Sequence, residues 1–168
     1  AAKNHSAVAV VTDPAHYGEL RVELEDCEGC TSAAARTRWA RNAFARVSEY
    51  DSRIASWLHD TRFDVPFQPR STVPMSLVQE LRYGENPHQR AAFYGEVGWT
   101  GPTLARARQH QGKHLSYNNI MDADAALAMV LEFDAPAAVV VKHANPCGAA
   151  TAADVVTAYG DALACDST

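Results

Sequence analysis

The residues in this sequence that are best suited to chemistry are Lys142 and His143, which stand side by side after an apolar stretch. Residues 137–141 are small or β-branched and predict a buried strand, and residues 145–148 (NPCG) predict the turn that follows. A lysine cation can stabilise developing negative charge, and a histidine can move a proton near neutral pH. The pair could supply both functions at one strand end. A solvated lysine and a turn-capping histidine are the structural alternative for the dipeptide alone.

A second segment, LRYGENPHQ, combines side chains that could bind a polar substrate. It begins inside a strand predicted for residues 76–83 and continues into a turn over residues 84–88. The fork of Arg82 suits phosphate or carboxylate, and Tyr83 can stack on a heterocycle or donate its hydroxyl. An ordinary strand-end pair is the alternative for these two residues, and His88 is interpreted as structural.

A third segment, LSYNNIMDADAA, is a polar turn that leads into a helix predicted for residues 120–133. Ser116 or Asn118 could cap this helix, which would account for their polarity. Asp122 and Asp124 follow near the helix start. They are interpreted as surface acids favoured by the helix dipole rather than as catalytic carboxylates.

These three segments, in this order and spacing, resemble the transformylase domain of the AICAR transformylase/IMP cyclohydrolase family, which is bifunctional and acts in purine biosynthesis. In weaker form, residues 1–5 (AAKNH) and 8–14 (VAVVTDP) look like the last part of the family's cyclohydrolase domain. The resemblance covers essentially the whole chain, whereas family members extend beyond both of its ends.

The resemblance implies formyl transfer from a co-substrate, 10-formyltetrahydrofolate, to the 5-amino group of AICAR, with ring closure to IMP by the cyclohydrolase domain. An acyl transfer to a weakly nucleophilic amine needs a proton removed and an oxyanion stabilised. His143 is the candidate proton shuttle. Lys142 is the candidate cation that orients the formyl group and stabilises the intermediate or the leaving folate nitrogen.

The resemblance also implies binding roles. The matching Arg-Tyr pair belongs to the family's AICAR-binding surface, so this role is expected for Arg82 and Tyr83. Asn119 matches an asparagine that lines the substrate site, where its donor and acceptor suit the substrate carboxamide. Lys3 matches a lysine that helps to close the ring of formyl-AICAR. The other residues of that second site are expected upstream, so this chain alone is not expected to be a cyclohydrolase.

Composition and element order favour an α/β architecture in two parts. A chain of 168 residues that is 47% hydrophobic can bury a core, and three prolines within nine residues predict a linker over residues 60–75. By the resemblance, residues 1–59 are the C-terminal part of a methylglyoxal-synthase-like cyclohydrolase domain. Residues 76–168 are the N-terminal part of a cytidine-deaminase-like α/β/α transformylase domain.

The pattern of apolar residues and breakers predicts further elements along the chain. They are a strand over residues 7–12, a loop over 18–29, a helix from Thr31 or Ser32 to about Leu58, a strand over 137–142 and a helix over about 152–164. The arginines of the long helix are interpreted as a solvated face.

Charge and hydropathy bear on partners and location. A net charge of −5 gives no basic field for a nucleic-acid backbone, so no nucleic acid is expected. No apolar run approaches the roughly 18 residues of a membrane span, so no membrane partner is expected, and the expected location is cytoplasmic. The resemblance implies a homodimer whose transformylase sites use residues of both chains.

Cysteines raise two questions about metal. Cys27 and Cys30 have CxxC spacing, but a zinc site needs a second ligand pair, so reduced thiols in a variable loop and no metal are expected. A zinc deaminase is an alternative based on His143 and Pro146-Cys147, although the glutamate after the histidine and the second cysteine are missing.

Another alternative for the whole chain is a non-catalytic piece that serves only folding or a dimer interface.

Overall fold

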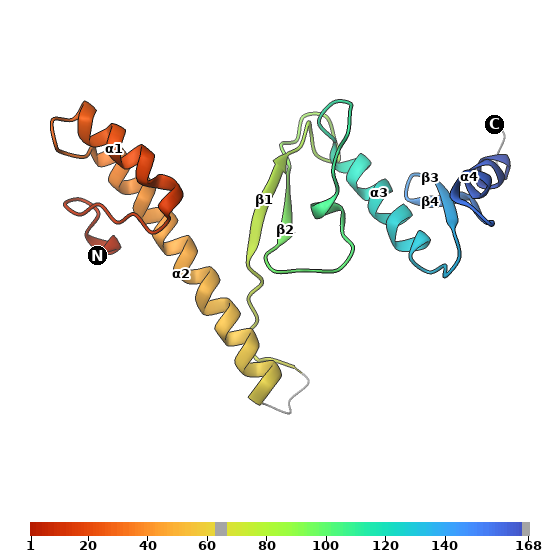
Figure 1. Cartoon of the computed structure of the whole chain (residues 1–168), viewed down its shortest axis with the longest axis horizontal. Helices are drawn as coiled ribbons and strands as arrows, with labels where there is room; N and C mark the ends of the chain where they lie inside the picture. The colour runs from red at the N-terminus through yellow and green to blue at the C-terminus, as the bar shows by residue number, and fades with distance from the viewer. Residues whose placement is uncertain (63–66, 166–168) are drawn as a thin grey trace. The chain divides into compact units, whose positions relative to one another are not determined.

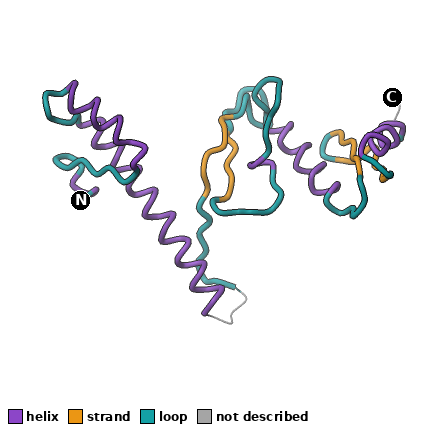
Figure 2. The backbone as a smooth tube through the Cα atoms, viewed as in Figure 1, coloured by secondary structure: helices purple, strands orange, loops and turns teal. Residues whose placement is uncertain are grey.

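The computed structural model describes residues 1–62 and 67–165. The chain divides into two compact units, residues 1–74 and 75–168. Helices make up the regular structure of the first unit, whereas the second combines helices with two antiparallel strand pairs (Figures 1 and 2). The chain is therefore a mixed α/β protein.

The first unit is built on two helices, α1 (Tyr17–Asp26) and α2 (Ala33–Arg62). The Ser32 hydroxyl accepts the Ala35 N–H at 3.2 Å, which confirms one of the two predicted caps. α2 runs past Leu58 to Arg62, into the first residues of the predicted linker, although His59, Asp60 and Thr61 are weak helix formers, because the first proline of that linker comes only at Pro66. Residues 63–66 of that linker lie outside the described residues.

Two predicted elements of the first unit were wrong. The predicted loop at residues 18–29 is largely helix α1, because its Glu, Leu and Arg side chains favour a helix and outweigh Gly18 near its start. The predicted strand at residues 7–12 is absent from the described structure. A strand needs a hydrogen-bonded partner, and the described pairings provide none for this segment.

The connection between α1 and α2 explains the CxxC spacing. Glu28 and Gly29 both have positive φ, 52° and 85°, and the Gly29 N–H bonds the Leu24 carbonyl at 2.7 Å. This is the left-handed ending that terminates many helices. Cys27 and Cys30 flank it as free thiols, so this spacing belongs to a helix-ending turn.

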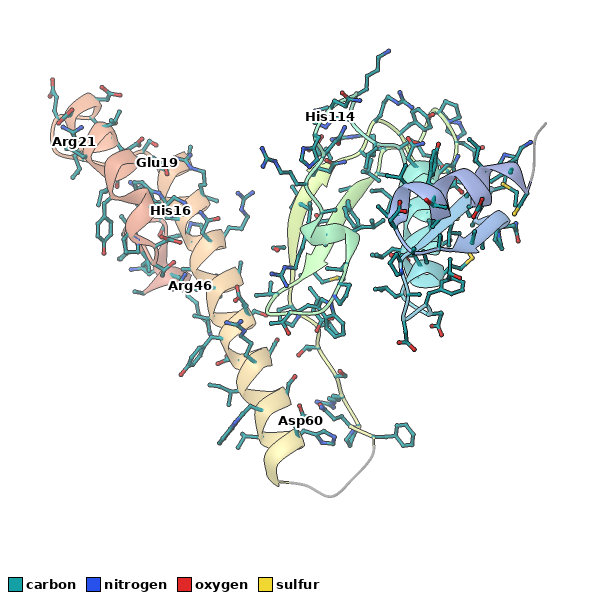
Figure 3. All side chains as sticks on the ribbon, turned by 45° about the vertical axis from the view of Figure 1, so that its right-hand side comes forward. His16, Glu19, Arg21, Arg46, Asp60 and His114 are labelled. Carbon is teal, nitrogen blue, oxygen red and sulfur yellow. The ribbon has the colours of Figure 1, made fainter. Side chains whose placement is uncertain are left out.

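Among the described residues of the first unit, the buried core lies on the first half of α2, and α1 has no buried residue. Trp39 is 1% exposed, and the other buried residues of α2 are small, namely Ala35, Ala40 and Ala43. Glu19 of α1 (labelled in Figure 3) accepts hydrogen bonds from Arg38 and from the Trp39 indole N–H. The two helices are therefore joined by an ion pair at the edge of a small apolar core.

The interpretation of the α2 arginines as a solvated face was wrong for Arg36. Its guanidinium is half-buried and donates to the His5 carbonyl at 3.0 Å and to the Thr31 carbonyl. These bonds fasten η1 (Ala2–Asn4) and the turn before α2 to the helix, because two backbone carbonyls share one cation.

The second unit begins with an antiparallel pair, β1 (Met75–Glu80) and β2 (Ala92–Glu96), whose register shifts between Leu77 and Gln79. β1 is shorter than the predicted strand of residues 76–83, and β2 was not predicted. After η3 (Leu104–Arg106), helix α3 (Tyr117–Val130) begins and ends three residues before the predicted bounds.

A second antiparallel pair follows α3. β3 (Ala137–Lys142) confirms the predicted strand, although its apolar residues are half-buried rather than buried, and it pairs with β4 (Asn145–Thr151). α4 (Val155–Ala164) starts later than predicted, after the cap Asp154. The strand pair lies between α3 and α4 (Figure 1). The predicted turn at residues 145–148 was wrong, because the chain reverses at residues 143 and 144 and then enters β4.

Gly148 allows α4 to lie directly on β4. A Cβ at this position would overlap the carbonyl of Ala162, which is 1% exposed on α4. Ala158 is fully buried on the same helix. Small residues on both elements thus bring helix backbone and strand backbone into contact.

Candidate functional site

The segment that carries Arg82 and Tyr83 lies against the start of α3. β1 ends at Glu80, so these residues follow the strand rather than end it, which corrects the prediction. The Arg82 N–H donates to the Leu115 carbonyl at 2.9 Å, and the Tyr117 N–H donates to the Tyr83 carbonyl at 3.1 Å. Two backbone bonds therefore fix this segment to the N-terminus of α3.

The side chains of this segment interact with each other and with the helix cap. The Arg82 guanidinium donates to the Tyr83 hydroxyl at 3.2 Å and lies 4.9 Å from the centre of its ring. A hydrogen bond with the buried Ser116, and then the Arg82 guanidinium, lower the pKa of Tyr83 below its ordinary value. The phenol is thus more acidic than a free tyrosine.

Ser116 and Asn119 form a reciprocal cap at the start of α3. The Ser116 hydroxyl accepts the Asn119 N–H at 3.4 Å, and the Asn119 side-chain oxygen accepts the Ser116 N–H at 3.1 Å and the Ser116 hydroxyl at 2.9 Å. Of the two predicted candidates, Ser116 and Asn118, Ser116 is therefore the residue that caps the helix. The side-chain oxygen of Asn119 is occupied by these bonds, so its NH₂ group is the part of the amide that remains as a donor.

Lys142 and His143 lie at the hairpin between β3 and β4, and both are exposed. Lys142 is the last residue of β3 and pairs with Asn145. His143 and Ala144 form the two-residue turn, and the Ala144 N–H donates to the Asp122 carboxylate of α3 at 2.7 Å. The hairpin is thus bonded to the same helix as the Arg82–Tyr83 segment.

This bond corrects the interpretation of Asp122 as a dipole-favoured surface acid. Asp122 is the sixth residue of α3, beyond the first turn where the dipole acts, and it is half-buried. Asp124 is exposed, as expected of a surface acid.

Two of the hollows along the described residues of the second unit bear on these elements. One, of about 500 Å³, is lined by Glu80, Leu81, Arg82, Lys113 and His114, so basic groups predominate; His114 is labelled in Figure 3. The other, of about 660 Å³, lies among β1, β2 and α3 and contains aromatic side chains such as Phe93, Trp99 and Tyr117. None of the predicted site residues lines the second hollow, so the chemistry of the motifs points to the first.

Lys3 belongs to the other unit and is exposed on η1. The described structure thus brings Arg82, Tyr83 and Asn119 to the start of α3 and connects the turn after Lys142 to the same helix.

Two residues that organise the site were not assigned a role in it from the sequence. The S-x-x-N pattern of residues 116–119 resembles a capping box, so Ser116 carried a usable signal. Asp122 carried none, because its partner is a backbone N–H that is 22 residues away in the chain.

Within residues 1–62 and 67–165, no group of three or more His, Cys, Asp or Glu side chains could hold a metal ion. In the same residues, no helix combines the length and apolar character that crossing a membrane requires.

The sequence places this chain in a family with two activities. The model of the AICARFT/IMPCHase bienzyme matches residues 1–168, and the chain belongs to this family. Curated relatives named bifunctional purine biosynthesis protein PurH include one from Dinoroseobacter shibae, 50% identical over 171 residues, which cover 100% of this chain and 32% of the relative. Another, from Neisseria meningitidis serogroup A, is 48% identical over 176 residues, covering 100% of this chain and 33% of the relative. The chain thus spans about a third of the relatives it matches.

Proposed function

We propose that residues 75–168 contribute part of an AICAR transformylase site and that residues 1–74 contribute part of an IMP cyclohydrolase site, in a protein of de novo purine biosynthesis. One observation carries the transformylase proposal. The Arg82–Tyr83 segment and the Lys142–His143 turn, which are distant in sequence, are both hydrogen-bonded to α3. Family membership supplies the reaction.

In the proposed reaction, the 5-amino nitrogen of AICAR attacks the formyl carbon of 10-formyltetrahydrofolate. A C–N bond forms, the bond from the formyl carbon to the folate nitrogen breaks, and the amine proton passes through His143 to the leaving nitrogen. Lys142 stabilises the negative charge of the tetrahedral intermediate. The exposure of both side chains leaves them accessible to substrate.

AICAR is proposed to bind beside this turn through the start of α3. The basic hollow that Arg82, Lys113 and His114 line suits an anionic group, and the Tyr83 ring suits a heterocycle. The free NH₂ group of Asn119 can donate to a carboxamide oxygen. In the proposed contact, the Asn119 NH₂ group is thus the hydrogen-bond donor and the carboxamide oxygen of AICAR is the acceptor.

The wider setting follows from the same family. We propose a cytidine-deaminase-like domain at residues 76–168, which the placement of β3 and β4 between α3 and α4 supports, and a methylglyoxal-synthase-like part at residues 1–59. A cytoplasmic homodimer is also proposed. Four free cysteines suit a reducing compartment, and exposed apolar side chains such as Phe44 and Leu77 suit cover by further protein.

The test uses a full-length protein that carries this segment, made by placing residues 1–168 in the matching third of the Dinoroseobacter shibae relative. Lys142→Ala and His143→Ala are expected to lower single-turnover formyl transfer, by about 100-fold for loss of a proton-transfer group. His110→Ala is the matched control. Unchanged transfer in either site variant would remove the role of that residue.

Binding is tested separately by titration calorimetry of AICAR into the same protein and into residues 1–168 alone. Arg82→Ala is expected to weaken binding, whereas Arg90→Ala, at an exposed ion pair with Glu80, is expected to leave it unchanged. Binding by the full-length protein but not by the folded segment would mean that further chain completes the pocket. Equal binding by the Arg82 variant would contradict its role.

A further inference from the structure

The turn that carries His143 has an unusual backbone. His143 and Ala144 have φ of 54° and 58°, so both lie in the left-handed region. Two-residue hairpins adopt this conformation because it matches strand twist, but they favour Asn, Asp or Gly at these positions. The methyl side chain of Ala144 cannot form the local hydrogen bonds by which Asn or Asp stabilises this conformation. Contacts outside the turn must therefore hold it.

Beyond the strand pairing of Lys142 with Asn145, two hydrogen bonds among the described residues stabilise the turn. The Asn145 side-chain NH₂ donates to the His143 carbonyl at 2.8 Å, from within the hairpin. The Ala144 N–H donates to Asp122 of α3 at 2.7 Å, and both of these residues are half-buried. Only the second bond fixes the turn to another element.

Asp122 does not act directly on the two candidate catalytic side chains. Among the described residues, its carboxylate forms no ion pair with Lys142 or His143. Its contact is with the backbone of the residue that follows them. Its effect on them must therefore pass through the position and conformation of the turn.

We propose that Asp122 is a positioning residue for formyl transfer: by accepting the Ala144 N–H, it holds the left-handed turn so that Lys142 and His143 face the substrate bound at the start of α3. The inference rests on the proposed function. Small displacements of catalytic groups can lower the reaction rate strongly. Loss of a single hydrogen bond that holds the turn should therefore have a measurable effect on the rate.

The test compares four substitutions in the full-length protein described above. Asp122→Ala removes the acceptor, and Asp122→Asn keeps an acceptor but removes the charge. Asp124→Asn, on the same helix and exposed, is the matched control. Ala144→Gly, alone and combined with Asp122→Ala, lets the turn adopt positive φ without support.

Asp122→Ala is expected to lower the single-turnover rate of formyl transfer by about 10- to 100-fold, while the KM for AICAR changes little. The single-turnover rate of Asp122→Asn is expected to stay within about threefold of that of the unchanged protein, because the amide oxygen of asparagine can still accept the Ala144 N–H. Adding Ala144→Gly to Asp122→Ala should restore part of the rate. Such recovery is expected of a turn-positioning role, not of general destabilisation.

Hydrogen exchange at the Ala144 amide provides a readout that needs no activity. The amide is expected to exchange faster in Asp122→Ala and to keep its protection in Asp124→Asn. An unchanged transfer rate in Asp122→Ala, equal losses in the Ala and Asn variants, or unchanged Ala144 exchange would each overturn the proposal. If the unchanged protein binds AICAR but transfers no formyl group, the proposed function fails, and the exchange result still decides whether Asp122 holds the turn.

Discussion

At the scale of single residues, Tyr83 is a group whose neighbours change its acidity. Hydrogen bonding with Ser116, followed by the Arg82 guanidinium, lowers the pKa of its phenol from the ordinary value of 10.0. Both partners stabilise the phenolate more than the neutral ring. The stabilisation by the ionised form is therefore fully present above about pH 10 and is lost as the pH falls through the lowered pKa.

Replacing the arginine should reverse part of this shift. In Arg82→Gln, the pKa of Tyr83 is expected to rise toward its ordinary value, because the cation beside the ring is lost. NMR titration of tyrosine-labelled protein measures this, with Tyr83→Phe to assign the signal. Arg90→Gln removes an arginine that is paired with Glu80 and should leave the Tyr83 titration as it is. An unshifted Tyr83 signal in Arg82→Gln would contradict the role of the guanidinium.

At the scale of elements, the contact between β4 and α4 depends on one glycine. Gly148→Ala is expected to destabilise the second unit by about 1–3 kcal/mol or more, because the new methyl group overlaps the Ala162 carbonyl and the helix must move. Urea unfolding followed by circular dichroism measures the change.

The same helix offers the matched control. Gly160 lies within α4, and a Cβ there would meet nothing within 4 Å. Gly160→Ala is expected to stabilise the unit by about 0.5–1 kcal/mol, because alanine has the higher helix propensity. Equal effects of the two substitutions would show that helix propensity, rather than close contact, governs this interface.

The pairing of α1 with α2 should depend on pH. A hydrogen bond from Arg38 lowers the pKa of Glu19, and hydrogen bonds from the Ser32 hydroxyl and N–H lower that of Glu23, from an ordinary value of 4.5. For a carboxyl with a lowered folded pKa, the stabilisation is present above the unfolded value and lost as pH falls through the folded one. The thermal midpoint should therefore decrease on acidification below about pH 4.5.

Circular dichroism melts between pH 6 and pH 3 test this dependence. The double variant Glu19→Gln and Glu23→Gln is expected to show a lower midpoint at pH 6 and a smaller further decrease in acid. Glu25→Gln, at an exposed pair with Arg21, is the control for loss of one carboxylate. If the thermal midpoint of the double variant decreases in acid as much as that of the unchanged protein, groups other than Glu19 and Glu23 must cause the decrease.

At the scale of the whole molecule, substitutions in the two units should affect different activities. In the full-length protein, Lys3→Ala is expected to slow ring closure of formyl-AICAR and to leave formyl transfer unchanged, because Lys3 lies on η1 of the first unit. Lys142→Ala should have the opposite pattern. Separate assays with AICAR and with formyl-AICAR measure the two steps. Loss of both activities in Lys3→Ala would contradict this division.

The sequence was most informative where local signals agree with the final structure. The apolar, β-branched run before Lys142 identified β3, and a serine before an alanine-rich stretch identified the start of α2. The motifs indicated the family because each is long and in order. Local propensity alone could not find β4, since asparagine, proline, glycine and alanine are weak strand formers and only pairing with β3 makes this segment a strand.

Other features depend on distant residues. Residues 8–11 are apolar like a strand, but no described segment pairs with them. The turn at His143 and Ala144 adopts a conformation that neither residue favours, so glycine and asparagine signals pointed to the wrong place. The role of Asp122 depends on a contact across 22 residues of chain, for which spacing gives no signal.

The three tryptophans occupy different surroundings, and this gives the molecule built-in fluorescence probes. Trp39 is 1% exposed in the core of the first unit, whereas Trp57 and Trp99 are 55% and 53% exposed. Trp39 should therefore emit at shorter wavelength and resist quenching by iodide. A chain with Trp57→Phe and Trp99→Phe would report on the first unit alone, and one that keeps only Trp99 would report on the second. The order in which the two units melt could then be followed by light emission from a single residue in each.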